Sequence, residues 1–364
     1  MNKLKIGIIG AGSIFEQHAQ TFKKCNSACE VTMVAKKNLE TGIEKIRTIF
    51  GDDVSIVDDY HKILNEPEID AVDIILPHDL HLPVTLAAAK AKKHILIEKV
   101  MARNIYECDQ MINACDNEGV TLVVCHDRRY HSDFLNLKKI LDGGNLGDIF
   151  YWKLEHNQNV VFPKDAWVRK KDGIGGGAIM SCLTHQIDCL RWYAGEFDSV
   201  SCMTKTIPER MEGEALGVLI GKMKSGALAQ LSINWYTSSN ITENGLWYEL
   251  IHVCGTQGEA YYMSGKGTYL KIHDESDKRI FEYDLEKTTS TFKKVELEEQ
   301  IHGHERCIKE WIKYLKGDPC ELSTFGTDSR KTVEVAEAAY RSVVNRKVID
   351  IPINPIPWAQ AILP

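Results

Sequence analysis

Near its amino terminus the chain reads Ile6-Gly7-Ile8-Ile9-Gly10-Ala11-Gly12-Ser13-Ile14-Phe15. The apolar run predicts a buried strand, and the glycines after it predict a tight turn that leads into a helix. Glycine lets the backbone approach a pyrophosphate, which then lies on the free N–H groups of the helix amino end. We therefore expect Gly10, Gly12, Ser13 and Ile14 to bind the dinucleotide NAD or NADP. Phe15 stands where the Gly-x-Gly-x-x-Gly pattern has its third glycine, and a plain tight turn is the alternative interpretation.

Residues 1–125 repeat this order of strand and helix. Apolar runs predict strands, and amphipathic stretches between them predict helices. Such alternation is typical of an α/β domain with a doubly wound parallel sheet, whose strands are buried on both faces. The predicted strands are 5–9, 31–35, 71–76, 94–97 and 121–125, and the predicted helices are 16–24, 39–50, 80–91 and 105–118.

The residues after the second predicted strand bear on the choice of dinucleotide. NAD is usually held by an acidic side chain there, which binds the ribose 2′-hydroxyl. This chain has Lys36 and Lys37 instead, and two ammonium groups favour the 2′-phosphate of NADP. The alternative is a pair of solvated lysines, so the cofactor is left as NAD(P).

Residues 126–364 have a different pattern. Alternating runs with turn residues between them predict an open, mainly antiparallel sheet, which with flanking helices makes an α+β domain. We expect it to bind the substrate and to pack closely on the first domain. The predicted strands are 149–155, 200–205, 215–222, 227–235, 246–253, 259–263, 269–273 and 280–283, and the predicted helices are 134–142, 178–194, 302–316 and 327–346.

Composition excludes several classes of protein. The net charge of −7 over 364 residues argues against a general nucleic-acid binder, which needs a basic surface. The apolar runs are far shorter than the ~20 residues that span a bilayer, and no signal peptide is expected. The 11 cysteines include no Cys-x-x-Cys pair, so we expect reduced thiols in the cytoplasm. His302 and His304 lack a suitably spaced third ligand, and no metal is expected.

Three further motifs carry a family resemblance. They are Pro77-His78-Asp79-Leu80-His81, Ile97-Glu98-Lys99-Val100 and the run from Gly175-Gly176-Gly177 to Thr184-His185-Gln186-Ile187-Asp188. In this order and spacing the chain resembles the Gfo/Idh/MocA oxidoreductases, which are NAD(P)-dependent dehydrogenases of mostly sugars and cyclitols. The resemblance implies a Rossmann domain followed by an open antiparallel sheet that often mediates oligomerisation. We therefore expect a homo-oligomer.

The resemblance also implies catalytic roles for two residues. Lys99 matches the family's lysine that faces the nicotinamide and the reacting oxygen, and its ammonium group would stabilise a developing alkoxide. His185 matches the catalytic histidine, which takes the hydroxyl proton. Val100 replaces the usual proline, and Ser181 replaces the aspartate that often orients the histidine. Asp172 or Asp188 is expected to supply the missing carboxylate.

The remaining matched residues are expected to line the two binding sites. Those implied to contact the cofactor are Pro77, His78, His81, Glu98, Trp167 and Arg169. Those expected to border the substrate are His126, Arg128, Tyr130, Asp172, Ser181, Thr184 and Asp188.

The expected activity is oxidation of a secondary ring hydroxyl of a sugar or glycoside. The variant Ser181-Cys182-Leu183-Thr184-His185-Gln186 is similar to glycoside 3-dehydrogenases, which form 3-oxo-glucosides and can initiate C-glycoside cleavage. Inositol or nucleotide-sugar dehydrogenases are the enzymatic alternatives. A non-catalytic NAD(P)-binding regulator on the same fold is the alternative from another class.

Overall fold

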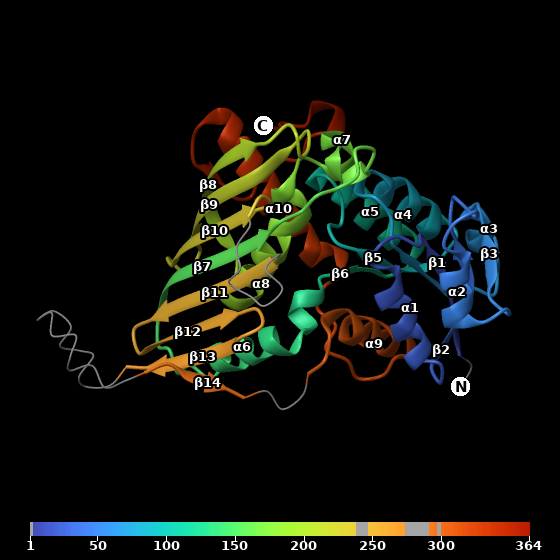
Figure 1. Ribbon diagram of the computed structural model, residues 1–364, viewed down its shortest axis with the longest axis horizontal. Helices are drawn as coiled ribbons and strands as arrows, with labels where there is room; N and C mark the ends of the chain where they lie inside the picture. Colours follow the sequence, from blue (N-terminus) through green and yellow to red (C-terminus); the bar gives the residue numbers. More distant parts are fainter. Residues whose placement is uncertain (1–2, 238–246, 274–290, 297–299) are drawn as a thin grey trace, which may run out of the picture.

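The protein is built around two β-sheets on opposite sides of the molecule, with most helices between and around them (Figure 1). The computed structural model describes residues 3–237, 247–273, 291–296 and 300–364. Within these residues, no helix is long and apolar enough to cross a membrane.

The amino-terminal sheet is fully parallel and has the strand order β3-β2-β1-β4-β5-β6. The predicted doubly wound α/β domain is therefore confirmed. Its strands are β1 (Leu4–Ile9), β2 (Cys29–Ala35), β3 (Ser55–Val57), β4 (Ala71–Ile74), β5 (His94–Glu98) and β6 (Leu122–Cys125). Its helices are α1 (Phe15–Lys24), α2 (Ile43–Phe50), α3 (His61–Leu64), η1 (His78–Leu80), α4 (His81–Lys90) and α5 (Ile105–Glu118). The sequence missed β3 and α3, because three or four residues are too few for a periodic pattern.

The order of strands places a crevice beside the glycine turn. β1 lies between β2 and β4, so the chain changes direction across the sheet at β1. Ligands of such sheets bind at the carboxyl ends of the strands near this switch point. The carboxyl ends of β1, β4, β5 and β6 carry the glycine turn, Pro77, Lys99 and His126, respectively.

The second sheet has the order β14-β13-β12-β11-β7-β10-β9-β8-β15, and only its β10–β7 pair is parallel among the described strands. The expected mainly antiparallel sheet is confirmed, although the predicted strand 280–283 lies outside the described residues. The strands are β7 (Ile149–Gln158), β8 (Phe197–Thr206), β9 (Glu214–Met223), β10 (Leu228–Asn234), β11 (Trp247–Gly255), β12 (Gly258–Met263), β13 (Gly267–Ile272), β14 (Lys293–Val295) and β15 (Ile349–Asp350).

Helices cover the face of this sheet that is turned toward the Rossmann domain (Figure 1). They are α6 (Ser132–Asp142), α8 (Thr184–Ala194) and α10 (Gly326–Asn345). The short segment η2 (Asp127–Tyr130) precedes α6, the segments η3 (Trp167–Arg169), α7 (Lys171–Ile174) and η4 (Ile179–Leu183) precede α8, and η7 (Trp358–Gln360) follows β15. One apolar core runs from Ile97 of the Rossmann sheet to Leu219 of the large sheet. The two domains therefore share a core.

One late helix returns to the first domain. α9 (Gly303–Lys316) packs on α1 and on η2, and Trp311 of α9 meets Phe22 of α1 in an edge-to-face contact with ring centroids 6.4 Å apart. α9 therefore brings residues from the carboxyl-terminal part of the chain to the crevice of the Rossmann sheet.

Candidate active site

A cavity of about 530 Å³ lies between the glycine turn and the start of α8. Both domains contribute to its wall, and it combines charged groups with aromatic rings. Its lining residues are Gly12, Ser13, Ile14, Gln17, Ile75, Leu76, Pro77, His78, Glu98, Lys99, Asp127, Arg128, Gln158, Phe162, Trp167, Val168, Ser181, Cys182, His185, Trp235, His302 and His304.

Lys99 enters this cavity from the end of β5. Its ammonium group donates a hydrogen bond to the backbone carbonyl of Ser181, with Nζ and O 2.9 Å apart. The Lys99–Val100 peptide bond is cis, and the Val100 side chain is fully buried. The lysine therefore reaches from the Rossmann domain to η4 of the second domain.

His185 lies opposite, in the first turn of α8. The preceding segment η4 is a turn of π-helix, a distortion that is common at functional sites. Nδ1 of His185 faces Oδ1 of Asp127 at 3.5 Å, and the His156 ring stacks on the imidazole with centroids 6.1 Å apart. The facing carboxylate leaves Nε2 as the nitrogen that can meet a substrate.

The surroundings of His185 disfavour its protonated form. Burial lowers the pKa of His185 well below its usual value, and the nearby cations Lys99 and Arg128 lower it further. The imidazole is therefore neutral at physiological pH and has a lone pair available to accept a proton.

Comparison with known proteins agrees with this arrangement. Residues 4–126 match the family model described as "Oxidoreductase family, NAD-binding Rossmann fold", and residues 134–261 match "GFO/IDH/MocA C-terminal domain". The chain belongs to the Gfo/Idh/MocA family. It is accordingly an NAD(P)-dependent oxidoreductase, and the alternative of a non-catalytic regulator is set aside.

Several proteins similar to this Gfo/Idh/MocA chain are dehydrogenases. It is 25% identical to myo-inositol 2-dehydrogenase of Thermotoga maritima over 96% of this chain and 98% of that protein. It is 30% identical to levoglucosan dehydrogenase of Pseudarthrobacter phenanthrenivorans over 61% of this chain and 60% of that protein. A solved levoglucosan dehydrogenase in complex with NADH and levoglucosan shares the fold, with a TM-score of 0.81, 21% identity, and coverage of 97% and 100% of the two chains.

The glycine turn has the shape that a dinucleotide requires. Gly10 has a φ of +106°, and a Cβ atom there would lie 2.0 Å from the carbonyl oxygen of Ile75. A Cβ atom on Gly12 would meet no atom within 4 Å, so open space borders the turn where α1 begins. The backbone of Gly12, Ser13 and Ile14 can therefore hold the pyrophosphate of NAD(P).

The carboxylate beside His185 is not one of those expected from the sequence. Asp172 is mostly exposed and accepts a hydrogen bond from Trp358 Nε1 at 2.6 Å, away from the cavity. Asp188 is buried in an ion pair with Arg129, at 2.6 and 2.7 Å. Burial would raise the pKa of Asp188, but Arg129 outweighs it and the pKa falls to about 2. Asp127 faces His185 instead.

Ser181 lines the cavity, and its backbone carbonyl accepts the hydrogen bond of Lys99. Thr184 is buried, and its hydroxyl donates to the carbonyl of Met180 in the preceding segment η4 at 3.1 Å. Ser181 lies in the π-helical turn η4, and Thr184 follows it directly.

Other expected contacts are not part of the cavity wall. The Tyr130 hydroxyl lies in the core, 3.3 Å from Thr324 Oγ1, and His126 is buried with Nδ1 3.9 Å from Asp188. Arg169 donates to the carbonyl of Glu209 at 2.9 Å. Each of these side chains is held by its own domain. His81 is likewise buried, with its ring nitrogens 2.9 Å from the carbonyl oxygens of Leu76 and Val100.

Lys36 and Lys37 follow the carboxyl end of β2, outside the lining of the cavity. Ala35, the last residue of β2, accepts a hydrogen bond from the N–H of Gly10 at 2.9 Å. The two lysines therefore begin next to the glycine turn, and Lys37 is exposed. Their contact with a 2′-phosphate stays a prediction.

Asp127 and His304 are among the lining residues that the sequence missed as catalytic or binding candidates. Asp127 lies between His126 and Arg128, which were both expected to border the substrate. Its position between these two residues was the one feature of the sequence that could have indicated its role. His304 was considered only as a metal ligand, because its sequence neighbours do not show that α9 returns to the Rossmann domain. Trp235 is an aromatic residue of a predicted strand, and such a residue is expected either in the sheet core or against the C–H face of a sugar; it lines the cavity.

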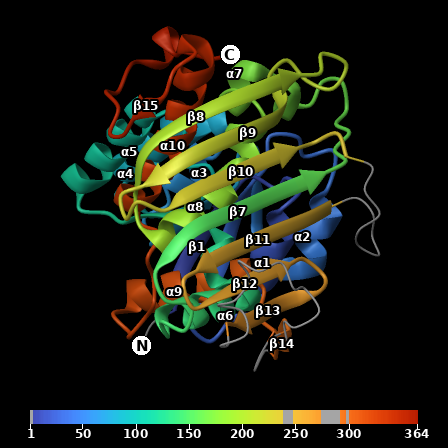
Figure 2. The same cartoon turned by 90° about the vertical axis from the view of Figure 1, so that its left-hand side faces the viewer.

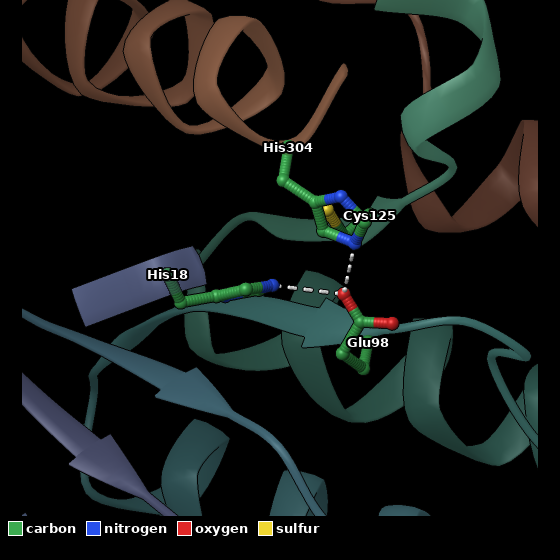
Figure 3. Close-up of side chains that lie close together, drawn as sticks. All are labelled: His18, Glu98, Cys125 and His304. Carbon is green, nitrogen blue, oxygen red and sulfur yellow. Dashed lines mark hydrogen bonds and ion pairs between the residues drawn. The ribbon is translucent and has the colours of Figure 1, made fainter. Parts of the chain in front are cut away.

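A buried cluster of His18, Asp73, Glu98 and His304 supports the floor of the cavity (Figure 3 shows all but Asp73). His18 lies 2.9 Å from Asp73 through Nδ1 and 2.9 Å from Glu98 through Nε2. Burial would lower the pKa of His18, but Asp73 and Glu98 outweigh it and raise it to about 10. Burial would raise the pKa of Glu98, but His18 and His304 hold it well below its usual value. Glu98 is therefore a carboxylate held by an imidazolium.

Two groups of described residues have donor atoms close enough to hold a metal ion. In the first, His18, Glu98, Cys125 and His304 have donor atoms within 4.8 Å of one another. We interpret this group as an ion-pair cluster, because the His18 ring lies between the carboxylates of Asp73 and Glu98, 2.9 Å from each. The second group, His252, Cys254 and Glu259, is half-buried on the large sheet, away from the cavity.

Proposed function

We propose that this chain oxidises a secondary hydroxyl group on the ring of a sugar or glycoside. The observation that carries the proposal is the convergence of Lys99, His185 and Asp127 in one cavity beside the glycine turn. When bound, the nicotinamide ring of NAD(P)⁺ supplies the acceptor for hydride. The chain itself must bind the hydroxyl, polarise it and take its proton.

Lys99 polarises the reacting oxygen. Its hydrogen bond to the carbonyl of Ser181 fixes the ammonium group at the boundary of the two domains. A fixed cation stabilises the negative charge that develops on the oxygen as the O–H bond breaks.

His185 takes the proton. Its depressed pKa keeps the imidazole neutral, and the carboxylate of Asp127 faces Nδ1 of the ring at 3.5 Å. Asp127 also stabilises the imidazolium that forms when Nε2 accepts the proton. His185 and Asp127 together can therefore act as a general base, although Ser181 stands where many family members have the aspartate that orients the histidine.

Two observations support a ring polyol as the substrate. The named relatives act on inositol and levoglucosan according to their names, and both compounds carry several ring hydroxyls. The cavity also contains Phe162 and Trp235, whose ring centroids are 5.6 Å apart. Aromatic faces provide apolar surface for the C–H face of a sugar.

The favoured position of oxidation is C3 of a glucoside, which gives a 3-oxo-glucoside. The segment Ser181–Gln186, which carries His185, supports this choice through its similarity to glycoside 3-dehydrogenases. A ketone at C3 acidifies the neighbouring C–H bond. A partner enzyme could then eliminate the aglycone, so the reaction could initiate C-glycoside deglycosylation.

Inositol oxidation is the second candidate. The similarity to myo-inositol 2-dehydrogenase extends over nearly the whole of both chains and favours it.

The test combines a substrate panel with position-specific isotopes. Purified protein is incubated with NAD(P)⁺ and with glucosides, inositols or nucleotide sugars, and oxidised sugar is detected by mass spectrometry. Mass detection is needed because a cofactor that stays bound and is recycled gives no free NAD(P)H. We expect glucosides to be oxidised, with a primary isotope effect only when deuterium is at C3.

Lys99→Met provides the control. It removes the ammonium group and keeps an unbranched side chain, so kcat should fall about 10²–10³-fold with cofactor affinity little changed. An isotope effect at C2 or C4, or a higher kcat/KM for myo-inositol, would contradict the C3 assignment. Wild-type turnover by Lys99→Met would contradict the mechanism.

A further inference from the structure

His304 occupies an unusual position for a residue so late in the chain. It lies in the first turn of α9, is 8% exposed and borders the cavity. Its Nδ1 is 3.6 Å from Oδ2 of Asp127, and its Nε2 is 3.5 Å from Oε1 of Glu98. Figure 3 shows the ring above Glu98 and His18 beside it, with both rings directed at the same carboxylate oxygen.

Asp127 is shared between two imidazole rings. Its Oδ1 faces Nδ1 of His185 at 3.5 Å, while its Oδ2 faces His304 and accepts a hydrogen bond from Nη1 of Arg128 at 2.5 Å. His185, Asp127 and His304 therefore form a continuous row from the general base to the edge of the Rossmann sheet. The separations are slightly longer than hydrogen bonds, and such contacts often tighten when substrate binds.

We propose that His304 receives, through Asp127, the proton that His185 removes from the substrate hydroxyl. The inference rests on the proposed role of His185 as the base. It assigns His304 the role of proton carrier in the oxidation.

The transfer balances without a further reactant. The O–H bond of the substrate breaks and an N–H bond forms at Nε2 of His185, while the hydride of the same carbon goes to NAD(P)⁺. The proton at Nδ1 of His185 then moves to Oδ1 of Asp127. Rotation of that carboxyl group breaks the contact of Oδ2 with Arg128 and brings the proton to Nδ1 of His304. His304 becomes an imidazolium and His185 is left neutral, and the carboxylate pairs with Arg128 again once the proton has left.

Electrostatics favour this direction of transfer. Lys99 and Arg128 lie near His185 and disfavour a positive charge there. His304 instead faces two carboxylates, Asp127 and Glu98. A cation between two anions is stabilised, and a cation beside two cations is not.

The other groups around His304 do not reverse this balance. Arg128 of η2 pairs with the Asp127 oxygen that faces His304, but it also pairs with Glu249 at 3.0 Å. From α1, the His18 imidazolium is nearest, with ring centroids 5.4 Å apart, but Asp73 and Glu98 already pair with it. From β6, the Cys125 thiol stays protonated, because its hydrogen bond with Cys307 and its burial raise its pKa well above the usual value. On its own segment, His302 stacks on His304 with centroids 5.2 Å apart.

The first test is chemical rescue. His304→Ala should lower kcat for sugar oxidation about tenfold or more, with KM little changed. Added imidazole should restore kcat in a concentration-dependent way, because it can enter the space left in the cavity wall. The matched control is His94→Gln, which replaces a half-buried histidine at the opposite end of β5 and should neither lower kcat nor respond to imidazole.

A second variant separates proton transfer from packing. His304→Gln keeps a polar side chain of similar size but cannot carry a proton, so its kcat should be as low as that of His304→Ala. Wild-type kcat in either variant would overturn the proposal. Loss of activity in His304→Ala that glutamine restores and imidazole does not would also overturn it, because that result indicates a packing role.

A third measurement does not depend on turnover. Histidine labelled with ¹³C at Cε1 reports ring protonation by NMR, and loss of its signal in His304→Gln assigns His304. At one fixed pH the signal should report less imidazolium in Asp127→Asn than in wild type, because one stabilising carboxylate becomes neutral. An unchanged signal in Asp127→Asn would overturn the proposal, whereas a wild type that oxidises no sugar would overturn only the proposed function.

Metal analysis completes the test. Stoichiometric bound zinc or manganese that is lost in His304→Gln would overturn the proposal, since Nε2 would then be a ligand. Metal-free protein with wild-type activity is the expected result.

Discussion

The protonation state of His185 is decided by its immediate neighbours. Burial, Lys99 and Arg128 all lower its pKa, so the neutral base persists at lower pH than for an ordinary histidine of pKa about 6.5. We therefore expect kcat/KM for oxidation to stay level from about pH 8 down to about pH 6.5, with its acid limb below that range. A pH profile of the wild-type enzyme measures this directly.

Ser181→Ala is the matched control for this profile. The Lys99 hydrogen bond uses the backbone carbonyl of Ser181, so the substitution retains it. If Asp127 rather than the serine hydroxyl faces the imidazole, the acid limb should not move. A limb at or above the ordinary histidine value in wild type would contradict the depressed pKa.

At the residue scale, the sequence identified the groups that lie in motifs. Lys99 and His185 were found because each lies in a recognisable sequence motif. Asp127 was missed as the partner of His185 because the contact joins η2 to α8, which are distant in the sequence. Asp172 and Asp188 were closer along the chain, but Trp358 and Arg129 hold them elsewhere. Distance along the chain is a poor guide to which carboxylate meets a buried imidazole.

At the scale of elements, we expect the end of β2 to determine the choice between NAD and NADP. Gly10 is hydrogen-bonded to Ala35, so Lys36 and Lys37 extend from the same corner as the glycine turn. We expect a higher kcat/KM with NADP⁺ than with NAD⁺. Changing both lysines to alanine should lower kcat/KM for NADP⁺ about tenfold, a loss of ~1.4 kcal/mol, and leave that for NAD⁺ within about twofold.

Initial rates with the two cofactors at low and high salt measure this preference. The NADP⁺ preference should weaken as salt rises, because exposed charges are screened. The control is Lys90→Ala, which removes a lysine at the far end of α4 and should leave the ratio unchanged. An equal loss with both cofactors after the double substitution would show that the lysines do not read the 2′-phosphate.

The elements were predicted well where their patterns are long. Helices α5, α9 and α10 agree with the sequence to within a residue or two, because several turns of periodic apolar residues define them. The π-helical turn η4 was read as ordinary helix, since the same apolar spacing suits both. Glycines 175–177 and the buried Glu214, which accepts from the N–H of Ile179 at 2.9 Å, shape that segment through tertiary contacts.

At the scale of the whole molecule, one face of the large sheet lacks a helical cover within the described part of the chain. Figure 2 shows strands β8 to β10 in front, with the helices behind them. Apolar side chains on these strands are exposed in one patch: Met203, Val218, Ile220 and Leu228. Register places Met203 beside Val218 and both on the same face as Ile220. Patches of this kind mark interaction sites.

We expect this face to bind a second copy of the chain. A twofold axis would pack the patch of one copy against the same patch of the other, so that both patches are buried. Sedimentation analysis should give a mass of at least twice 41.1 kDa. Ile220→Lys should shift the protein toward monomer, because it places a charge at the centre of the patch. Val344→Lys, on the exposed side of α10, is the matched control and should keep the wild-type mass. A wild-type protein that sediments as a monomer at micromolar concentration would contradict the expectation, since the patch would then remain exposed to water without a partner.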